Sequence, residues 1–285
     1  MIDRRLLVVS GKGGVGKSAL TAAIALRAAR TGKQVLAVSM TGGAGLAPHL
    51  GMRSLEYTPV KAAPGVWALT IDRATALDEY IRLQMHVPRL APTAAVIRGF
   101  GVFVDTVPGI REVVTIGKVV FEAAQDRWDL VVADAPPTGQ LMSYLRAPRV
   151  IADLVPAGRV KEQAAWMEGI LGDPAGSGLV LVAIPEELPV VETLETLDEL
   201  AAEPAIGVAA IAYNRVLPPL DLGGRDPAGL AAGPHRDAAV LHLGAREAQQ
   251  EWLQRLPAGP RVPYLFGLLT PGEVAARLAD LWEEA

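Results

Sequence analysis

The chain has 285 residues, of which 51% are apolar and 20% are charged, so it can bury one large core. Its formal net charge of −4 gives no basic field that would attract nucleic acid or an anionic membrane surface. The absence of cysteine excludes disulfides, thiolate zinc sites and thiolate arsenite sites.

The N-terminal region carries no targeting or membrane signal that we can identify. No apolar run in the chain approaches the roughly 18–20 residues that a membrane-spanning helix needs. The basic segment 4–6 reaches Gly11 and Lys12 too soon for a secretory signal peptide. We therefore expect a cytoplasmic globular protein with no stable membrane insertion and no nucleic-acid partner.

Residues 10–18 read Ser-Gly-Lys-Gly-Gly-Val-Gly-Lys-Ser, a complete phosphate-binding loop (P-loop). The β-branched apolar run 6–9 precedes it and the helix-forming stretch 19–26 follows, which is the context that this motif requires. Lys17 is predicted to reach the β- and γ-phosphates, and the Ser18 hydroxyl to bind Mg²⁺. The alternative is a glycine-rich turn with two solvated lysines. The expected nucleotide contacts in the loop are Gly11, Gly13, Gly14, Val15, Gly16, Lys17, Ser18 and Ala19.

Seven apolar segments are predicted as strands, with helix-forming stretches between them. They are residues 6–10, 35–39, 66–71, 130–134, 179–184, 206–213 and 261–266. Several are nearly continuous apolar runs, as expected when helices cover both faces of a sheet. This alternation predicts an α/β fold with a doubly wound, mainly parallel sheet of about seven or eight strands flanked by helices.

Residues 1–285 are expected to form a single P-loop domain, with helical insertions around 73–127 and 140–178 that supply a helical subdomain. The Gly- and Pro-rich segment 218–233 is predicted to be a long mobile loop. Two further stretches are predicted to be amphipathic helices that pack on the scaffold. Their apolar stripes are Leu188, Val191, Leu194 and Leu197 in one, and Val274, Leu278, Leu281 and Trp282 in the other.

The predicted strand 130–134 ends in a carboxylate, Asp134, which is the arrangement of a Walker B motif. At the carboxyl end of a strand beside the P-loop, Asp134 is expected to hold a Mg²⁺-bound water or Ser18. A strand-ending aspartate that starts a turn is the alternative. The following residues 135–140, Ala-Pro-Pro-Thr-Gly-Gln, favour the metal-site interpretation.

Residues 12–18, Lys-Gly-Gly-Val-Gly-Lys-Ser, resemble the deviant Walker A motif of a family that includes arsenite-transport, tail-anchored-protein targeting, chromosome-partition and septum-site ATPases. Residues 134–140 resemble the switch II segment of the arsenite-transport and tail-anchor branch, usually Asp-Thr-Ala-Pro-Thr-Gly-His. Shorter similar segments occur at 67–72, 76–80, 108–112, 185–187, 192–193 and 214–216.

This resemblance implies ATP and Mg²⁺ as cofactors and a dimer, in which Lys12 crosses the interface to the phosphates of the partner subunit. Lys12, Lys17 and Asp134 are then the expected catalytic residues, with Ser18 and Asp134 at the metal, the latter through water. The dimer is expected to be a homodimer or a heterodimer with a related paralogue. An unidentified cargo or client protein is also implied.

The resemblance further implies that Asn214 contacts the adenine base, because an amide can donate to a ring nitrogen and accept from the exocyclic amine. Pro263 and Tyr264 then fall where the family's adenine-lining loop lies. A strand-ending turn and a buried tyrosine are the alternatives at these positions.

One departure concerns switch I, where the family carries Ser-Thr-Asp-Pro-Ala-His and this chain has Ser-Met-Thr-Gly-Gly-Ala at 39–44. Thr41 stands in place of the aspartate that orients the attacking water. A neutral hydroxyl cannot take up the water's proton, and losing such a group removes about 10²–10⁴-fold of rate. Gln140 in place of the switch II histidine points the same way.

Four hypotheses follow from these observations. The leading one is a dimeric ATP-binding ATPase with nucleotide-driven opening and closing and impaired hydrolysis. The alternative is a catalytically silent nucleotide-binding subunit of a heterodimer with an active paralogue. A chaperone for hydrophobic segments and a metabolite kinase remain open, although the six methionines are scattered and no acceptor-binding motif is evident.

Overall fold

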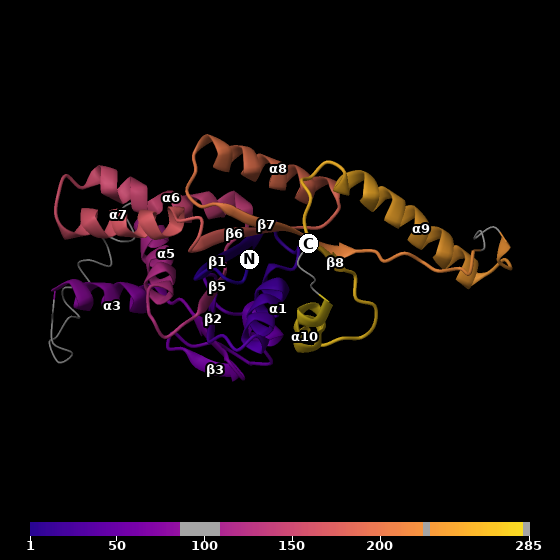
Figure 1. Cartoon of the computed structure of the whole chain (residues 1–285), viewed down its shortest axis with the longest axis horizontal. Coiled ribbons are helices and arrows are strands. Elements are labelled where there is room, and N and C mark those ends of the chain that lie inside the picture. The colour runs from indigo at the N-terminus through magenta and orange to yellow at the C-terminus, as the bar shows by residue number, and fades with distance from the viewer. Residues whose placement is uncertain (86–108, 225–228, 282–285) are drawn as a thin grey trace.

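The computed structural model of the chain describes residues 1–85, 109–224 and 229–281. In this part of the chain, eight strands form one sheet (Figure 1). They are β1 (Leu6–Gly11), β2 (Val35–Ser39), β3 (Val60–Ala63), β4 (Val66–Thr70), β5 (Leu130–Asp134), β6 (Ser177–Ala183), β7 (Val208–Val216) and β8 (Arg261–Pro263).

The strand order is β3-β4-β2-β5-β1-β6-β7-β8, and every neighbouring pair is parallel except the edge pair β3–β4. The expected doubly wound, mainly parallel sheet is therefore confirmed, and the fold is that of a P-loop nucleoside triphosphatase. Strand β1 lies in the interior of the sheet, between β5 and β6. The loop that follows β1 is thus placed at the carboxyl edge, where such sheets bind ligands.

Helices lie on both faces of the sheet, and one long helix extends away from it at the right of the view (Figure 1). The helices are α1 (Lys17–Arg30), α2 (Leu46–His49), α3 (Arg73–Met85), α5 (Ile110–Ala123), α6 (Thr138–Leu154), α7 (Arg159–Gly172), α8 (Glu187–Ala202), α9 (Pro234–Leu253) and α10 (Pro271–Leu281). Alternate residues of β1 point to opposite faces. Leu6 and Val8 pack in the core with residues of α5, α6, α7 and α8, whereas Leu7 and Val9 pack with residues of α1, α2 and α10.

Two strand predictions differ clearly from the structure, and the bounds of the other predicted strands agree with it to within three residues. Strand β3 was not predicted, because it is a short antiparallel edge strand that is only partly buried and therefore lacks a continuous apolar run. The last strand ends at Pro263 and not at Phe266, whose side chain is 58% exposed.

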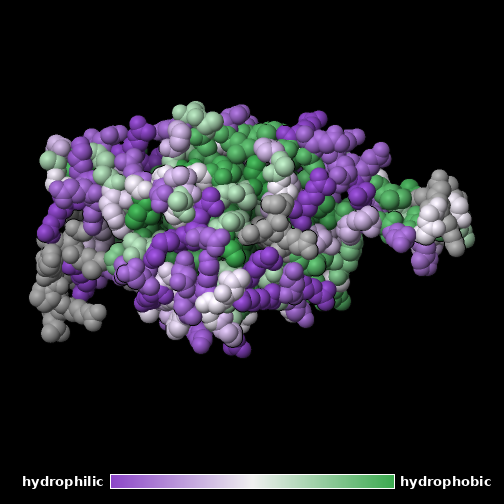
Figure 2. Space-filling view, viewed as in Figure 1, coloured by the Kyte–Doolittle hydropathy of each residue, from purple (hydrophilic) through white to green (hydrophobic). Residues whose placement is uncertain are grey.

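The apolar stripe predicted for 185–203 is wrong in part. Helix α8 buries Val190 and Leu200, with Leu194 and Leu197 packed against the core, whereas Leu188 is 63% exposed and Val191 39%. The physical reason is that residues three apart shift by about 60° around a helix at each step, so a stripe with this spacing winds away from the core. Figure 2 shows apolar side chains at the surface in the region of α8 and β7.

The stripe predicted for the last helix also differs, because Leu278 is buried and Leu281 is 48% exposed. Trp282 of that stripe lies outside the described residues, as do Pro108 and positions 225–228 of the loop predicted between β7 and α9. The interval 73–127 contains α3 and α5, and the interval 140–178 contains most of α6 and all of α7. No helix in the described part of the chain has the length and apolar character needed to cross a membrane.

Candidate functional site

The P-loop connects β1 to α1 and has a backbone that only glycine accommodates at two positions. Gly11 has φ of 154°, and a Cβ placed there would lie 2.1 Å from the Val182 carbonyl oxygen. Gly16, the N-cap of α1, has φ of 96°, and its Cβ would lie 2.3 Å from Asn214 Nδ2. Ideal Cβ atoms on Gly13 and Gly14 meet no protein atom within 4 Å, so this side of the loop is open to a ligand.

A hydroxyl and a carboxylate meet directly below the loop. Ser18 Oγ, in the first turn of α1, donates a hydrogen bond of 2.7 Å to Asp134 Oδ2 at the end of β5. Adjacent parallel strands bring them together, because β1 and β5 are paired through Val9 and Asp134. Hydroxyl and carboxylate oxygens are the hard ligands that Mg²⁺ prefers, so the residues present fit that ion.

Burial controls the charges in this site. The low-dielectric surroundings of Asp134 raise its pKa to about 6, although the hydrogen bond from Ser18 and the charge of Lys17 act in the opposite direction. Burial also lowers the pKa of Lys17, while the carboxylates of Asp134 and Glu192 oppose that change. Asp134 and Lys17 therefore each favour the charged form of the other.

Both lysines of the loop are held within the chain. Lys17 Nζ donates to the Lys12 carbonyl oxygen at 2.9 Å, and Lys12 Nζ forms an ion pair with Glu192 Oε1 on α8. Thr138 Oγ1, at the start of α6, donates to the other oxygen of Glu192 at 3.5 Å. Sequence reasoning missed Glu192 as a member of the site. The segment 192–193 carried a family resemblance, but nothing in the sequence indicated that it contacts the P-loop.

Asn214 lies against the P-loop from the side of β7. Its buried amide donates from Nδ2 to the Val15 carbonyl oxygen at 2.8 Å and accepts from the Arg215 N–H at 3.0 Å. Arg215 adopts a left-handed backbone conformation, with φ of 57°. Both ends of the Asn214 amide are therefore occupied, the nitrogen by the P-loop and the oxygen by the backbone of its own strand.

The other two residues expected at the adenine lie at the end of β8. Pro263 pairs in register with Val216, and the Tyr264 N–H donates to the Val216 carbonyl oxygen at 2.8 Å. The Tyr264 side chain is 42% exposed and its ring packs against Phe266, with the ring centroids 4.9 Å apart. The buried tyrosine considered as an alternative is therefore not observed.

The segment 39–45, which was expected to be switch I, lies against Ser18 and Asp134. The Gly43 N–H donates to Ser39 Oγ at 2.9 Å, which folds the chain back after β2. An ideal Cβ on Gly45 would lie 2.7 Å from Ser18 Oγ and 3.9 Å from Asp134 Oδ2, so the backbone approaches both residues closely. The Thr41 side chain is exposed.

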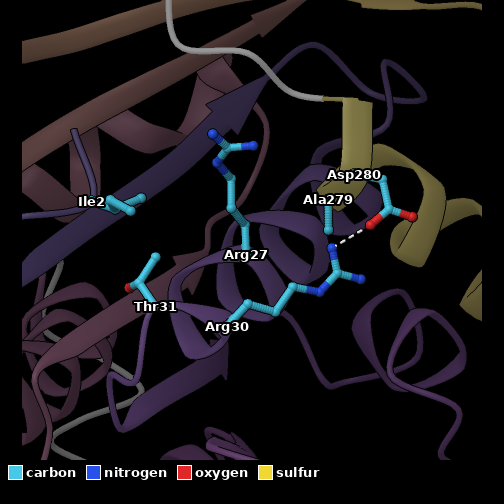
Figure 3. Close-up of a pocket in the computed structure, with 6 residues that line it drawn as sticks. All are labelled: Ile2, Arg27, Arg30, Thr31, Ala279 and Asp280. Atoms are coloured by element: carbon cyan, nitrogen blue, oxygen red, sulfur yellow. Dashed lines mark hydrogen bonds and ion pairs between the residues drawn. The ribbon is translucent and has the colours of Figure 1, made fainter.

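A separate open hollow lies at the opposite end of α1 (Figure 3). Arg27 and Arg30 of α1 line it together with Asp280 of α10, which pairs with Arg30 at 2.5 Å. Since α1 spans 14 residues, this hollow is about 20 Å along the helix from the P-loop and does not belong to the candidate site. The described residues include no cluster of three or more side chains of the kinds that bind metals.

Comparison with known proteins gives a consistent result. A family model described as "Anion-transporting ATPase" matches residues 4–162, which include the P-loop and Asp134. The chain is 34% identical over 228 residues to "ATPase BagA" of Mycobacterium tuberculosis, covering 75% of this chain and 66% of that protein. It is 30% identical over 285 residues to an "Arsenical pump-driving ATPase" of Escherichia coli, covering 89% of this chain and 44% of that protein. The match thus spans less than two thirds of the length of either relative.

Proposed function

We propose that this chain, which belongs to the anion-transporting ATPase family, binds ATP with Mg²⁺ and hydrolyses it slowly as part of a dimer. The observation that carries the proposal is the Ser18–Asp134 hydrogen bond of 2.7 Å, placed beside Lys17 at the start of α1. These three groups provide the metal ligands and the phosphate cation that such an enzyme requires.

Each side chain has a defined role in this proposal. The N–H groups of the loop and the positive end of the α1 dipole would bind the phosphates, and Lys17 would balance their charge. Ser18 would ligate Mg²⁺ and Asp134 would hold it through water; the ion itself would neutralise charge on the phosphates. Pro263 and Tyr264 would lie beside the adenine, and Asn214 would contact it after giving up one of its present partners.

The dimer is proposed because the side chain of Lys12 lies at the margin of the site, where it is 29% exposed. From there its ammonium group can turn toward the phosphates of a second subunit, either another copy of this chain or a paralogue. A cargo protein would bind elsewhere on such a dimer and respond to its opening and closing. Arsenite is not proposed as the cargo, because the chain has no thiolate to bind it.

Calorimetric titration of the purified chain with Mg²⁺-ATP tests the binding. We expect saturable binding that Lys17→Ala abolishes, since that variant removes the cation at the phosphates. Lys161→Ala is the matched control, because Lys161 is an exposed lysine on α7 and its loss should leave the affinity unchanged. A folded wild-type chain that does not bind Mg²⁺-ATP would overturn the proposal.

A second candidate is a silent subunit that binds ATP but does not turn it over. Thr41 favours it, because no carboxylate occupies that position of the loop next to Ser18 and Asp134. Steady-state hydrolysis by the chain alone and by Thr41→Asp separates the two. Slow turnover that Thr41→Asp raises by about 10²-fold or more supports the weak ATPase. No turnover by either protein, with ATP binding intact, supports the silent subunit.

A further inference from the structure

We propose that Glu192 is a resting counter-charge of the P-loop, a carboxylate that the triphosphate displaces in order to free Lys12. The inference rests on the proposed ATP site and names a regulatory residue within it. Glu192 lies on α8, 180 residues from Lys12 in the chain, and the two side chains form a direct ion pair.

The charges around the loop support this assignment. Two cations, Lys12 and Lys17, face two carboxylates, Asp134 and Glu192, and the field of Glu192 extends to Lys17 as well as to its direct partner. Asp134 accepts a hydrogen bond from Ser18, whereas the Glu192 carboxylate, in the part of the chain that the structure describes, bonds to Lys12 and Thr138 and not to Ser18. Glu192 therefore supplies to these cations a negative charge of the kind that a phosphate would supply.

A bound triphosphate would bring several negative charges to the same cations. Glu192 would then be repelled by the phosphates while Lys12 is attracted to them, so the two side chains would separate. The Lys12 and Glu192 side chains are 29% and 36% exposed, which leaves both free to move into solvent without a large desolvation cost. This ion pair is thus weak enough to be exchanged when nucleotide binds.

Separation of Glu192 from Lys12 would also affect residues 134–140, the segment that resembles switch II. The second oxygen of Glu192 accepts from Thr138 at the first residue of α6, four residues after Asp134. Further along, Arg146 of α6 forms ion pairs with Glu199 of α8 at 2.8 Å and with Glu203, the residue that caps α8, at 3.0 Å. Release of Glu192 would therefore loosen the two helices only at the end nearest the P-loop.

Mg²⁺-ATP titration of Glu192→Gln tests the proposal. The variant has no carboxylate to compete for Lys12, so its dissociation constant is expected to fall by about 3- to 10-fold. Glu195→Gln is the matched control, because it makes the same charge change on the exposed side of α8, one turn away, and should bind as the wild type does. Thermal unfolding without nucleotide checks that both variants are folded. If Glu192→Gln does not fold, Glu192→Ala is used in its place.

A double-mutant cycle with Lys12→Gln separates a specific pair from a general charge effect. In the Lys12→Gln background, the gain from Glu192→Gln should become smaller, since no ion pair remains to be broken. An unchanged or weaker affinity of Glu192→Gln, with the wild type binding normally, would overturn the role of Glu192, as would a fully additive cycle. A wild-type chain that does not bind at all would instead overturn the proposed function.

Discussion

Asp134 is a buried carboxylate whose charge opposes folding but serves the proposed metal site. Only 3% of the residue is exposed, and burial raises its pKa from 3.8 to about 6. The folded chain therefore binds this proton more tightly than the unfolded chain does. Stability from this group is present below about pH 4 and is lost as the pH rises toward 6 and above.

We expect Asp134→Asn to raise the free energy of unfolding at pH 7.5 by about 1–3 kcal/mol. A rise in the pKa of Asp134 from 3.8 to about 6 corresponds to ~3 kcal/mol, and the loss of a favourable partner for Lys17 reduces this gain. The advantage should shrink as the pH is lowered to 4.5. Urea unfolding of both proteins at several pH values, without nucleotide or Mg²⁺, measures the difference. A difference that does not change with pH would contradict the raised pKa of Asp134.

At the scale of elements, a partly buried charge cluster joins α3 to α5. Lys118 of α5, 6% exposed, pairs with Glu79 of α3 at 2.7 Å and with Glu122 at 3.0 Å. Trp128 Nε1 donates to Glu122 at 2.9 Å, and the Lys118 ammonium lies 4.7 Å from the centre of the Tyr57 ring. Lys118 thus compensates Glu122, which is 7% exposed, and Glu79, which is 35% exposed.

Lys118→Met is expected to lower the free energy of unfolding by about 3–5 kcal/mol, because it leaves the buried carboxylate of Glu122 without a cation. Changing Glu79 and Glu122 to glutamine in the same chain should recover much of that loss. Urea unfolding checks both variants, with Lys161→Met as an exposed lysine control expected to stay within about 0.5 kcal/mol of the wild type. Equal stability of Lys118→Met and wild type would show that the cluster contributes nothing.

The elements also show what the sequence could and could not predict. Strands such as 130–134 were predictable because burial on both faces produces an apolar run that needs no further context. The buried face of α8 was not predictable, because apolar residues spaced three apart do not identify the side of the helix that packs on the core. Leu188, which was expected to be buried, is exposed. The short edge strand β3 lacks an apolar run altogether.

At the scale of the molecule, the parallel sheet gathers the site from distant parts of the chain. The P-loop and Asp134 were predictable, because motif and strand end identify them locally. The contact of Glu192 with Lys12 was not, because it depends on how α8 sits on the finished sheet. The support that Asn214 gives to Val15 likewise depends on β7 lying next to β6.

The proposed dimer gives a prediction about the whole molecule. Addition of Mg²⁺ and a non-hydrolysable ATP analogue at saturating concentration is expected to double the mass of the protein measured by light scattering. The reason is that Lys12 would bind phosphates across the interface. Lys12→Ala should still bind the analogue through Lys17 and Ser18 but keep the monomer mass, while Lys161→Ala should double its mass as the wild type does. A wild-type chain that binds the analogue and remains monomeric would exclude the homodimer. Its mass would then have to be measured again with an active paralogue present, because only a heterodimer would leave Lys12 a second set of phosphates to reach.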